Sequence, residues 1–236
     1  MVSRVQCVFA GQEGLRLQSS AHPEATRQHM IDYLTTPCEG MARAHVVLAH
    51  GAGAMMDTPF MDTIATGLAK REMQVSRFEF PYMAKRRMDG KRRGPDPQKV
   101  LVATWLEVID TFSSGLSLFI GGKSMGGRMA SMVAEAPGVT GVICLGYPFH
   151  PPGKPDRLRT EHLETMTRPT LIVQGERDTF GRREEVLTYS LDEAVQITWI
   201  PDGDHSFKPR KKSGHTEADN LQRAIEVTAE FVAQHL

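Results

Sequence analysis

The sequence predicts an α/β protein in which a mostly parallel, doubly wound sheet is flanked by helices. From about residue 44 onward, short apolar runs recur without polar alternation, which is typical of strands buried on both faces. Segments with helical periodicity separate these runs, so successive strands need crossover connections and run parallel. We expect one domain over residues 31–236. Residues 1–30 have weak periodicity and form an N-terminal extension, either a leading strand pair or a loose segment.

The first half of the domain contains three predicted strands and two predicted helices. Thr58-Pro59 and Asp96-Pro97 begin the helices, because proline is well tolerated in the first helical turn and apolar residues then recur on one face. The strands cover residues 45–51, 73–81 and 116–122.

The second half continues the alternation. A short helix is predicted at 127–136 and an amphipathic helix at 216–236, with strands at 142–148, 170–175 and 195–201. Only about twenty residues connect the strand ending at residue 148 to the next one. This connection leaves no room for a separate lid domain, although it is long enough for a small helical flap.

Composition excludes several classes of protein. Lysine plus arginine total 28, as do aspartate plus glutamate, so no net charge attracts nucleic acid or a membrane surface. No apolar run approaches the roughly 18 residues that span a bilayer. Three cysteines (Cys7, Cys38 and Cys144) are too few for a disulfide framework. We expect a soluble cytoplasmic protein of open oligomeric state, with no cofactor and no metal site.

The stretch "GGKSMGG" over residues 121–127 fits two motifs. A phosphate-binding P-loop would need its first glycine at Ser117 and a flexible loop where the apolar strand runs. The alternative, G-x-S-x-G, is the sharp strand-to-helix turn that presents a nucleophilic serine, and it has the required strand before it and helix after it. We therefore assign Ser124 as the candidate nucleophile.

An acid and a base follow in the order that such a serine needs. Asp178 follows the strand at 170–175, and His205 follows the strand at 195–201. A hydroxyl needs a general base, and the imidazole needs a carboxylate that fixes its tautomer. The competing acids are Glu176, Asp202 and Asp204.

The loop after the first apolar strand is the expected source of an oxyanion hole. In "AHGAGAMMD" (49–57), glycines let the backbone approach a substrate closely. The expected donors are the N–H groups of Met125 and Ala52, with Gly53 as the alternative to Ala52. His50 is expected to orient this loop.

Five segments together resemble the α/β-hydrolase superfamily, and in particular its small lidless branch similar to dienelactone hydrolase. They are "LAHGAGAMMDTPFM", "RFEFPYMAKRR", "GGKSMGGRMAS", "QGERDTFG" and "DGDHSF". The resemblance implies an α/β-hydrolase domain over 31–236, with Ser124 as nucleophile, Asp178 as acid and His205 as base. The predicted-hydrolase subgroup that these segments resemble also includes a regulatory subunit of a histone acetyltransferase complex and a testis-expressed relative. Dienelactone hydrolase itself has cysteine at the elbow.

Two basic runs and one aromatic segment are candidates for substrate binding. "MAKRRMDGKRRG" (83–94) includes Arg86 and Arg87, and a second basic run covers 208–212. Both can attract an anionic substrate, or both can be solvated surface loops. No aromatic residue interleaves with the basic ones, which makes nucleic acid an unlikely partner. In "GYPFHPPGKP" (146–155) we expect Tyr147, Phe149 and His150 to wall the pocket, with burial in the core as the alternative for Phe149.

Two functional hypotheses follow. The favoured one is a serine hydrolase, of carboxylesterase or thioesterase type, that cleaves a small ester or thioester through an acyl-enzyme, and the basic runs allow that substrate to be anionic. The alternative is a binding or scaffold module of the same fold that contacts an anionic partner through its basic loops.

Overall fold

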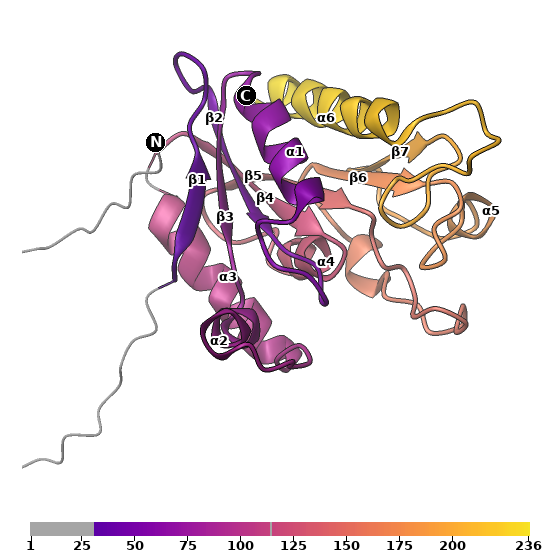
Figure 1. Cartoon of the computed structure of the whole chain (residues 1–236), viewed down its shortest axis with the longest axis horizontal. Coiled ribbons are helices and arrows are strands. Elements are labelled where there is room, and N and C mark those ends of the chain that lie inside the picture. Colours follow the sequence, from indigo (N-terminus) through magenta and orange to yellow (C-terminus); the bar gives the residue numbers. More distant parts are fainter. Residues whose placement is uncertain (1–30, 114) are drawn as a thin grey trace, which may run out of the picture. The chain divides into compact units, whose positions relative to one another are not determined.

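The computed structural model describes residues 31–113 and 115–236. The predicted extension over residues 1–30 lies outside them. The sheet has seven strands in the order β1-β3-β2-β4-β5-β6-β7 (Figure 1). β1 is antiparallel to β3, and every other neighbouring pair is parallel, as expected. The strands are β1 (Tyr33–Thr36), β2 (Ala44–Ala49), β3 (Met73–Phe78), β4 (Ser117–Lys123), β5 (Val139–Leu145), β6 (Thr170–Gly175) and β7 (Val195–Ile200).

Helices cover both faces of this sheet. They are α1 (Pro59–Ala69), α2 (Pro81–Asp89), α3 (Gln98–Phe112), α4 (Met125–Ser131), α5 (Arg183–Val186) and α6 (Glu217–Gln234). One core packs α1 and α6 against alternate strand residues such as Val46 and Leu48. The other packs α3 and α4 against the residues between them, such as Val47 and Ala49 (Figure 1). The inner strands β2, β4, β5 and β6 are therefore buried on both sides along most of their length, which explains their mainly apolar sequences.

Local sequence signals set the ends of the helices. The Thr58 hydroxyl accepts a hydrogen bond from the Met61 N–H, so Thr58 caps α1 directly before Pro59. Thr216 caps α6 in the same way through the Asp219 N–H. The first helix was predicted from Thr58-Pro59, whereas the last was predicted from its amphipathic pattern alone.

The prediction of a basic loop over residues 83–94 was wrong in its first half. Residues 81–89 form α2, which begins at Pro81, buries Tyr82 and Met83, and ends before Gly90. The density of basic residues obscured the helix, because only one of its turns is apolar. The rest of the run, residues 90–94, has no regular structure.

Other boundaries also differ from the prediction. β1 was not predicted; it is a four-residue edge strand of mixed polarity. β5 begins at Val139 rather than at 142, and α4 covers 125–131 rather than 127–136. The short α5 and a single 3₁₀ turn at Glu161–Leu163 were also missed.

The connection from β5 to β6 contains only that 3₁₀ turn, so the described residues include no separate lid domain. Among residues 31–113 and 115–236, no helix combines the length and the apolar character needed to cross a bilayer.

Candidate active site

Ser124 occupies a sharp turn between β4 and α4. Its backbone has φ 51° and ψ −114°, a conformation that non-glycine residues rarely adopt. The flanking glycines are required because β2 passes close by. A Cβ at Gly122 would lie 2.1 Å from the Ala49 carbonyl oxygen, and one at Gly126 would lie 2.4 Å from the same atom. The G-x-S-x-G spacing is therefore imposed by the backbone of β2.

His205 lies in the loop that follows β7, and contacts with α1 and α6 help to hold this loop. Phe207 is fully buried, and its ring lies 5.5 Å from that of Phe60 on α1. The Asn220 side-chain amide of α6 donates to the carbonyls of Pro201 and Phe207. The loop is thus fastened to both helices of one face of the sheet.

The structure brings Ser124, His205 and Asp178 together in one hydrogen-bonded line. His205 Nε2 lies 2.9 Å from Ser124 Oγ, and His205 Nδ1 lies 2.7 Å from Asp178 Oδ2. An ionised carboxylate only accepts hydrogen bonds, so Nδ1 carries the proton and Nε2 faces the serine hydroxyl as an acceptor. The Phe180 ring stacks on the imidazole at 4.3 Å between centroids.

Asp178 is fully buried and is held by neighbours that the sequence analysis did not identify. The Gln174 side-chain amide donates to Asp178 Oδ2 at 3.0 Å, and the Phe180 N–H donates to Oδ1 at 2.9 Å. Gln174 also bonds the backbone N–H and C=O of Tyr147. The available signal was a polar residue at the end of the otherwise apolar "TLIVQG".

The three competing acids have other partners. Glu176 pairs with Arg183 and accepts a hydrogen bond from the Asp202 N–H. Asp202 pairs with Arg177 and Arg210. Asp204 accepts from the N–H groups of residues 206 and 208 and so closes its own loop. None of the three hydrogen-bonds to the His205 ring among the described residues.

The loop over residues 51–54 lies beside this line and is fixed through its carbonyls. The Tyr82 hydroxyl donates to the Ala52 carbonyl at 2.9 Å, and Arg86 Nη1 donates to the Gly53 carbonyl at 3.3 Å. Within the described part of the chain, the N–H groups of Ala52, Gly53 and Met125 have no hydrogen-bond partner. All three N–H groups that were expected as oxyanion donors are therefore unpaired within the described residues.

His50 connects this loop to the end of β3. Its Nε2 accepts a hydrogen bond from the Phe80 N–H, and its Nδ1 lies 2.7 Å from the Gly51 carbonyl oxygen. Burial lowers the pKa of His50, so the ring is neutral. Its role in orienting the loop agrees with these contacts.

The expected pocket wall of Tyr147, Phe149 and His150 is corrected by the structure. The first two side chains are fully buried and His150 is nearly so. The Tyr147 hydroxyl donates to the Arg159 carbonyl, and Phe149 belongs to the core under α3 and α4. Proline and glycine beside these residues resembled a surface loop, but the segment packs inward and leaves these side chains no open face.

The two arginines expected to bind substrate differ in their surroundings. Arg87 donates to Glu79 and Asp57, so two carboxylates already balance its charge. This pairing leaves Arg87 poorly suited to bind an anion. Within the described residues, the Arg86 side chain hydrogen-bonds to the Gly53 carbonyl alone and forms no ion pair.

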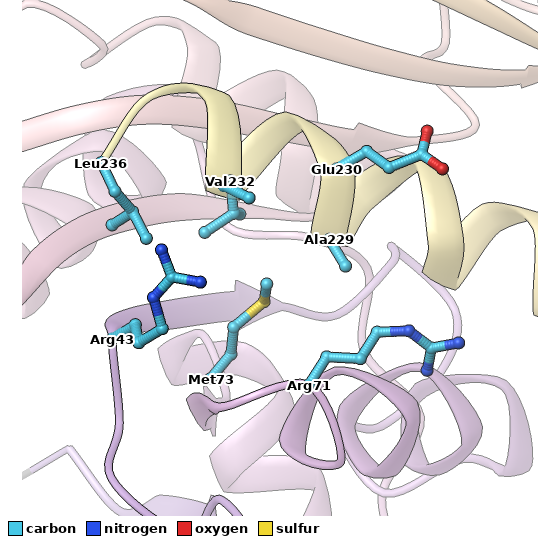
Figure 2. A pocket seen from close by; sticks show the side chains of 8 residues that line it. Arg43, Arg71, Met73, Ala229, Glu230, Val232 and Leu236 are labelled. Atoms are coloured by element: carbon cyan, nitrogen blue, oxygen red, sulfur yellow. The ribbon is translucent and has the colours of Figure 1, made fainter.

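A pocket of about 250 Å³ lies elsewhere, at the opposite end of the parallel strands (Figure 2). Met73, the first residue of β3, points into it, and Arg43 and Arg71 flank it below the last turns of α6. The three triad residues follow the carboxyl ends of β4, β6 and β7. This pocket is therefore separate from the candidate active site.

Comparisons with known proteins agree with this architecture. The family described as alpha/beta hydrolase domain matches residues 42–233. A dienelactone hydrolase structure from Anabaena variabilis is similar with a TM-score of 0.67 and 20% identity, covering 87% of this chain and 92% of that one. An alpha-beta serine hydrolase homologue from Coxiella burnetii has a TM-score of 0.64 and 20% identity over 85% and 90%. A serine hydrolase without lid from Xanthomonas campestris has 0.63 and 19% over 87% and 89%.

Proposed function

The chain belongs to the alpha/beta hydrolase family, and from that premise we propose that it is a serine hydrolase that cleaves small esters or thioesters through an acyl-enzyme. The observation that carries the proposal is the unbroken line from Ser124 Oγ through His205 to the buried Asp178. A serine within reach of a base that is itself oriented by a carboxylate is the arrangement that activates a hydroxyl.

Each side chain has a role in the proposed reaction. Ser124 Oγ attacks the acyl carbon while its proton passes to His205 Nε2, and Asp178 stabilises the imidazolium. The carbonyl oxygen becomes an oxyanion that accepts hydrogen bonds from the Met125 and Ala52 N–H groups, with Gly53 as the alternative second donor. Nε2 then protonates the departing alcohol or thiol as its bond to the acyl carbon breaks. Water repeats the sequence against the acyl-enzyme and releases the acid.

Active-site labelling tests this proposal. A fluorophosphonate probe should label the wild-type protein, with loss of fluoride as the Ser124 oxygen bonds to phosphorus. Ser124→Ala and His205→Ala should remain unlabelled while keeping wild-type circular dichroism. An unlabelled wild-type protein with an intact fold contradicts the proposal.

We also propose that Arg86 favours substrates whose acyl group carries a carboxylate. Its guanidinium contacts the Gly53 carbonyl, next to the free amides of the oxyanion loop. The test compares p-nitrophenyl acetate with the p-nitrophenyl monoester of succinate. Arg86→Gln should lower kcat/KM for the succinate ester several-fold more than for acetate. Lys85→Gln on the same helix is the control, and equal losses on both esters exclude a role in recognition.

A second candidate function is a binding module for an acidic partner, which would match the regulatory relatives that the sequence resembles. It is favoured by Lys85, Lys91 and Arg92, which are exposed and have no ion pair within the described residues. If it holds, the folded protein should resist the fluorophosphonate. It should also bind a polyglutamate matrix that Lys85→Gln/Lys91→Gln/Arg92→Gln no longer binds.

A further inference from the structure

Lys123 is a charged residue in the elbow to which the proposed mechanism gives no role. It is the last residue of β4 and stands directly before Ser124, where the motif accepts any residue type. Its ammonium donates a hydrogen bond to the backbone carbonyl of His205 at 2.5 Å, across 82 positions of the sequence. Lys123, which precedes the candidate nucleophile, therefore holds the backbone of His205, the candidate base.

The surroundings of Lys123 leave a narrow channel for its side chain. Gly146, just after β5, has φ +70°, and a Cβ there would lie 2.9 Å from Lys123 Nζ and 2.8 Å from the His205 carbonyl oxygen. The Phe60 ring of α1 lies 5.6 Å from Nζ, at a cation–π distance. The charged groups that face the ammonium are Asp178 after β6 and Asp204 in the His205 loop.

We propose that Lys123 is a positioning residue whose ammonium fixes the backbone of His205, so that the reactivity of Ser124 depends on the charge of Lys123. The inference rests on the proposed function. Asp178 fixes the far side of the imidazole ring through Nδ1, but a ring can rotate and shift with its own backbone. The hydrogen bond to the His205 carbonyl removes that freedom. A displacement of about 1 Å in a reacting group can slow a reaction on the order of 100-fold.

Burial disfavours the charged form of Lys123, and two nearby carboxylates favour it. Burial lowers the pKa of Lys123 to about 8, although Asp178 and Asp204 act in the opposite direction. Above that pH the amine becomes neutral, and its hydrogen bond to the carbonyl loses the assistance of the charge. The reactivity of Ser124 should therefore decline as pH rises through about 8.

Stability should change in the opposite direction. An unfolded chain keeps its lysine protonated up to the ordinary pKa of 10.5. Between about pH 8 and that value the unfolded state binds more protons than the folded state, so the contribution of Lys123 to stability rises with pH. If Ser124 becomes less reactive between about pH 8 and the ordinary lysine pKa, a loss of stability caused by Lys123 therefore does not explain it.

The experiment measures the rate of fluorophosphonate labelling from pH 6 to pH 10 for the wild type, Lys123→Met and Lys123→Arg. Methionine approximates the unbranched apolar stem of lysine but provides neither charge nor donor, and arginine keeps its charge throughout this range. We expect Lys123→Met to label about 10- to 100-fold more slowly at pH 7 and to lose the decline near pH 8. Its Tm at pH 7 should equal or exceed that of the wild type. A residue needed only for folding would lower Tm instead.

Each outcome decides a separate question. Labelling of the wild type, with none in Ser124→Ala, establishes that Ser124 is reactive, whatever the role of Lys123. If Lys123→Met then labels at the wild-type rate with the same decline near pH 8, the positioning role is wrong. If that variant does not fold, Lys123→Arg decides: retained labelling at pH 9 to 10 supports the role, and a decline matching the wild type overturns it.

Discussion

At the scale of single residues, the elbow depends on two positions where β2 leaves no space for a side chain. Ser124 adopts its strained backbone because Gly122 and Gly126 let the turn press against the carbonyl of Ala49. Gly53 lies in the neighbouring oxyanion loop, and a Cβ there would contact nothing. Packing against β2 therefore requires glycine at positions 122 and 126 of the elbow, whereas Gly53 in the neighbouring loop is exposed.

This difference gives a matched pair of substitutions. Gly122→Ala should cost on the order of 3 kcal/mol or more, because a Cβ 2.1 Å from a backbone oxygen forces β2 and β4 apart. Gly53→Ala should change stability by no more than about 0.5 kcal/mol. Chemical denaturation of both variants measures the difference. Similar losses for the two would mean that close approach of β2 is not what requires glycine in the elbow.

Gln174 gives a second prediction at this scale. Gln174→Met removes the acceptor of the buried Tyr147 N–H, the donor to the Gly181 carbonyl and one donor to Asp178. We expect a loss of about 3 kcal/mol of stability, because unsatisfied buried polar groups cost about 1–3 kcal/mol each. Fluorophosphonate labelling should also slow about tenfold. The exposed Gln196→Met on β7 is the control, and an equally small effect of both would show that Gln174 is dispensable.

The sequence motifs identified the candidate triad residues but not the residues that hold the triad in position. Ser124, Asp178 and His205 could be located because each lies at or shortly after the carboxyl end of a predicted strand. Gln174 and Lys123 could not be assigned a role, since their partners lie at positions that only the folded sheet brings together. The burial of Tyr147 depends on the same long-range contacts.

At the scale of elements, α2 holds the loop over residues 51–54, which is the proposed source of an oxyanion hole. Tyr82 and Arg86 of this helix contact the loop, and Arg87 connects the helix to Glu79 and Asp57. The side chain of Glu79 is only 4% exposed, so Arg87 compensates a buried charge. The strands and the long helices were predictable from apolar periodicity. α2 and β1 were not, because their apolar faces are too short to give a pattern.

Removing the charge of Arg87 tests the role of this helix. Arg87→Met should cost about 2 kcal/mol of stability, since Glu79 stays buried and, among the residues that the structure describes, keeps only the Met56 N–H as a hydrogen-bond partner. Adding Glu79→Gln should recover part of that loss. Arg93→Met breaks the exposed pair with Asp89 on the same segment and should have no measurable effect. Denaturation midpoints that fall equally for Arg87→Met and Arg93→Met would contradict the assignment.

At the scale of the whole molecule, three neutral histidines are placed in different parts of the fold. Burial lowers the pKa of His45 and of His162 to about 4, and it also lowers the pKa of His50. His45 lies between Ser76 on β3 and the Phe112 ring of α3. His162 bonds the Ser131 hydroxyl at the end of α4. Protonation of any of the three would place a charge where its present contacts favour a neutral ring.

Acid should therefore weaken the folded state well before its carboxylates titrate. Between about pH 6.5 and pH 4 these histidines bind protons in the unfolded chain but not in the folded protein. Stability therefore falls as pH falls across that window. Each histidine contributes up to about 1.4 kcal/mol per pH unit. Allowing for the partial exposure of His162, we expect the free energy of unfolding to drop by about 3 kcal/mol from pH 7 to pH 5.

The measurement is urea denaturation at both pH values, with His45→Gln beside the wild type. Glutamine can still bond Ser76 but does not titrate, so the variant should lose about 1 kcal/mol less than the wild type over the same interval. An identical loss in both proteins would place the acid sensitivity in other groups.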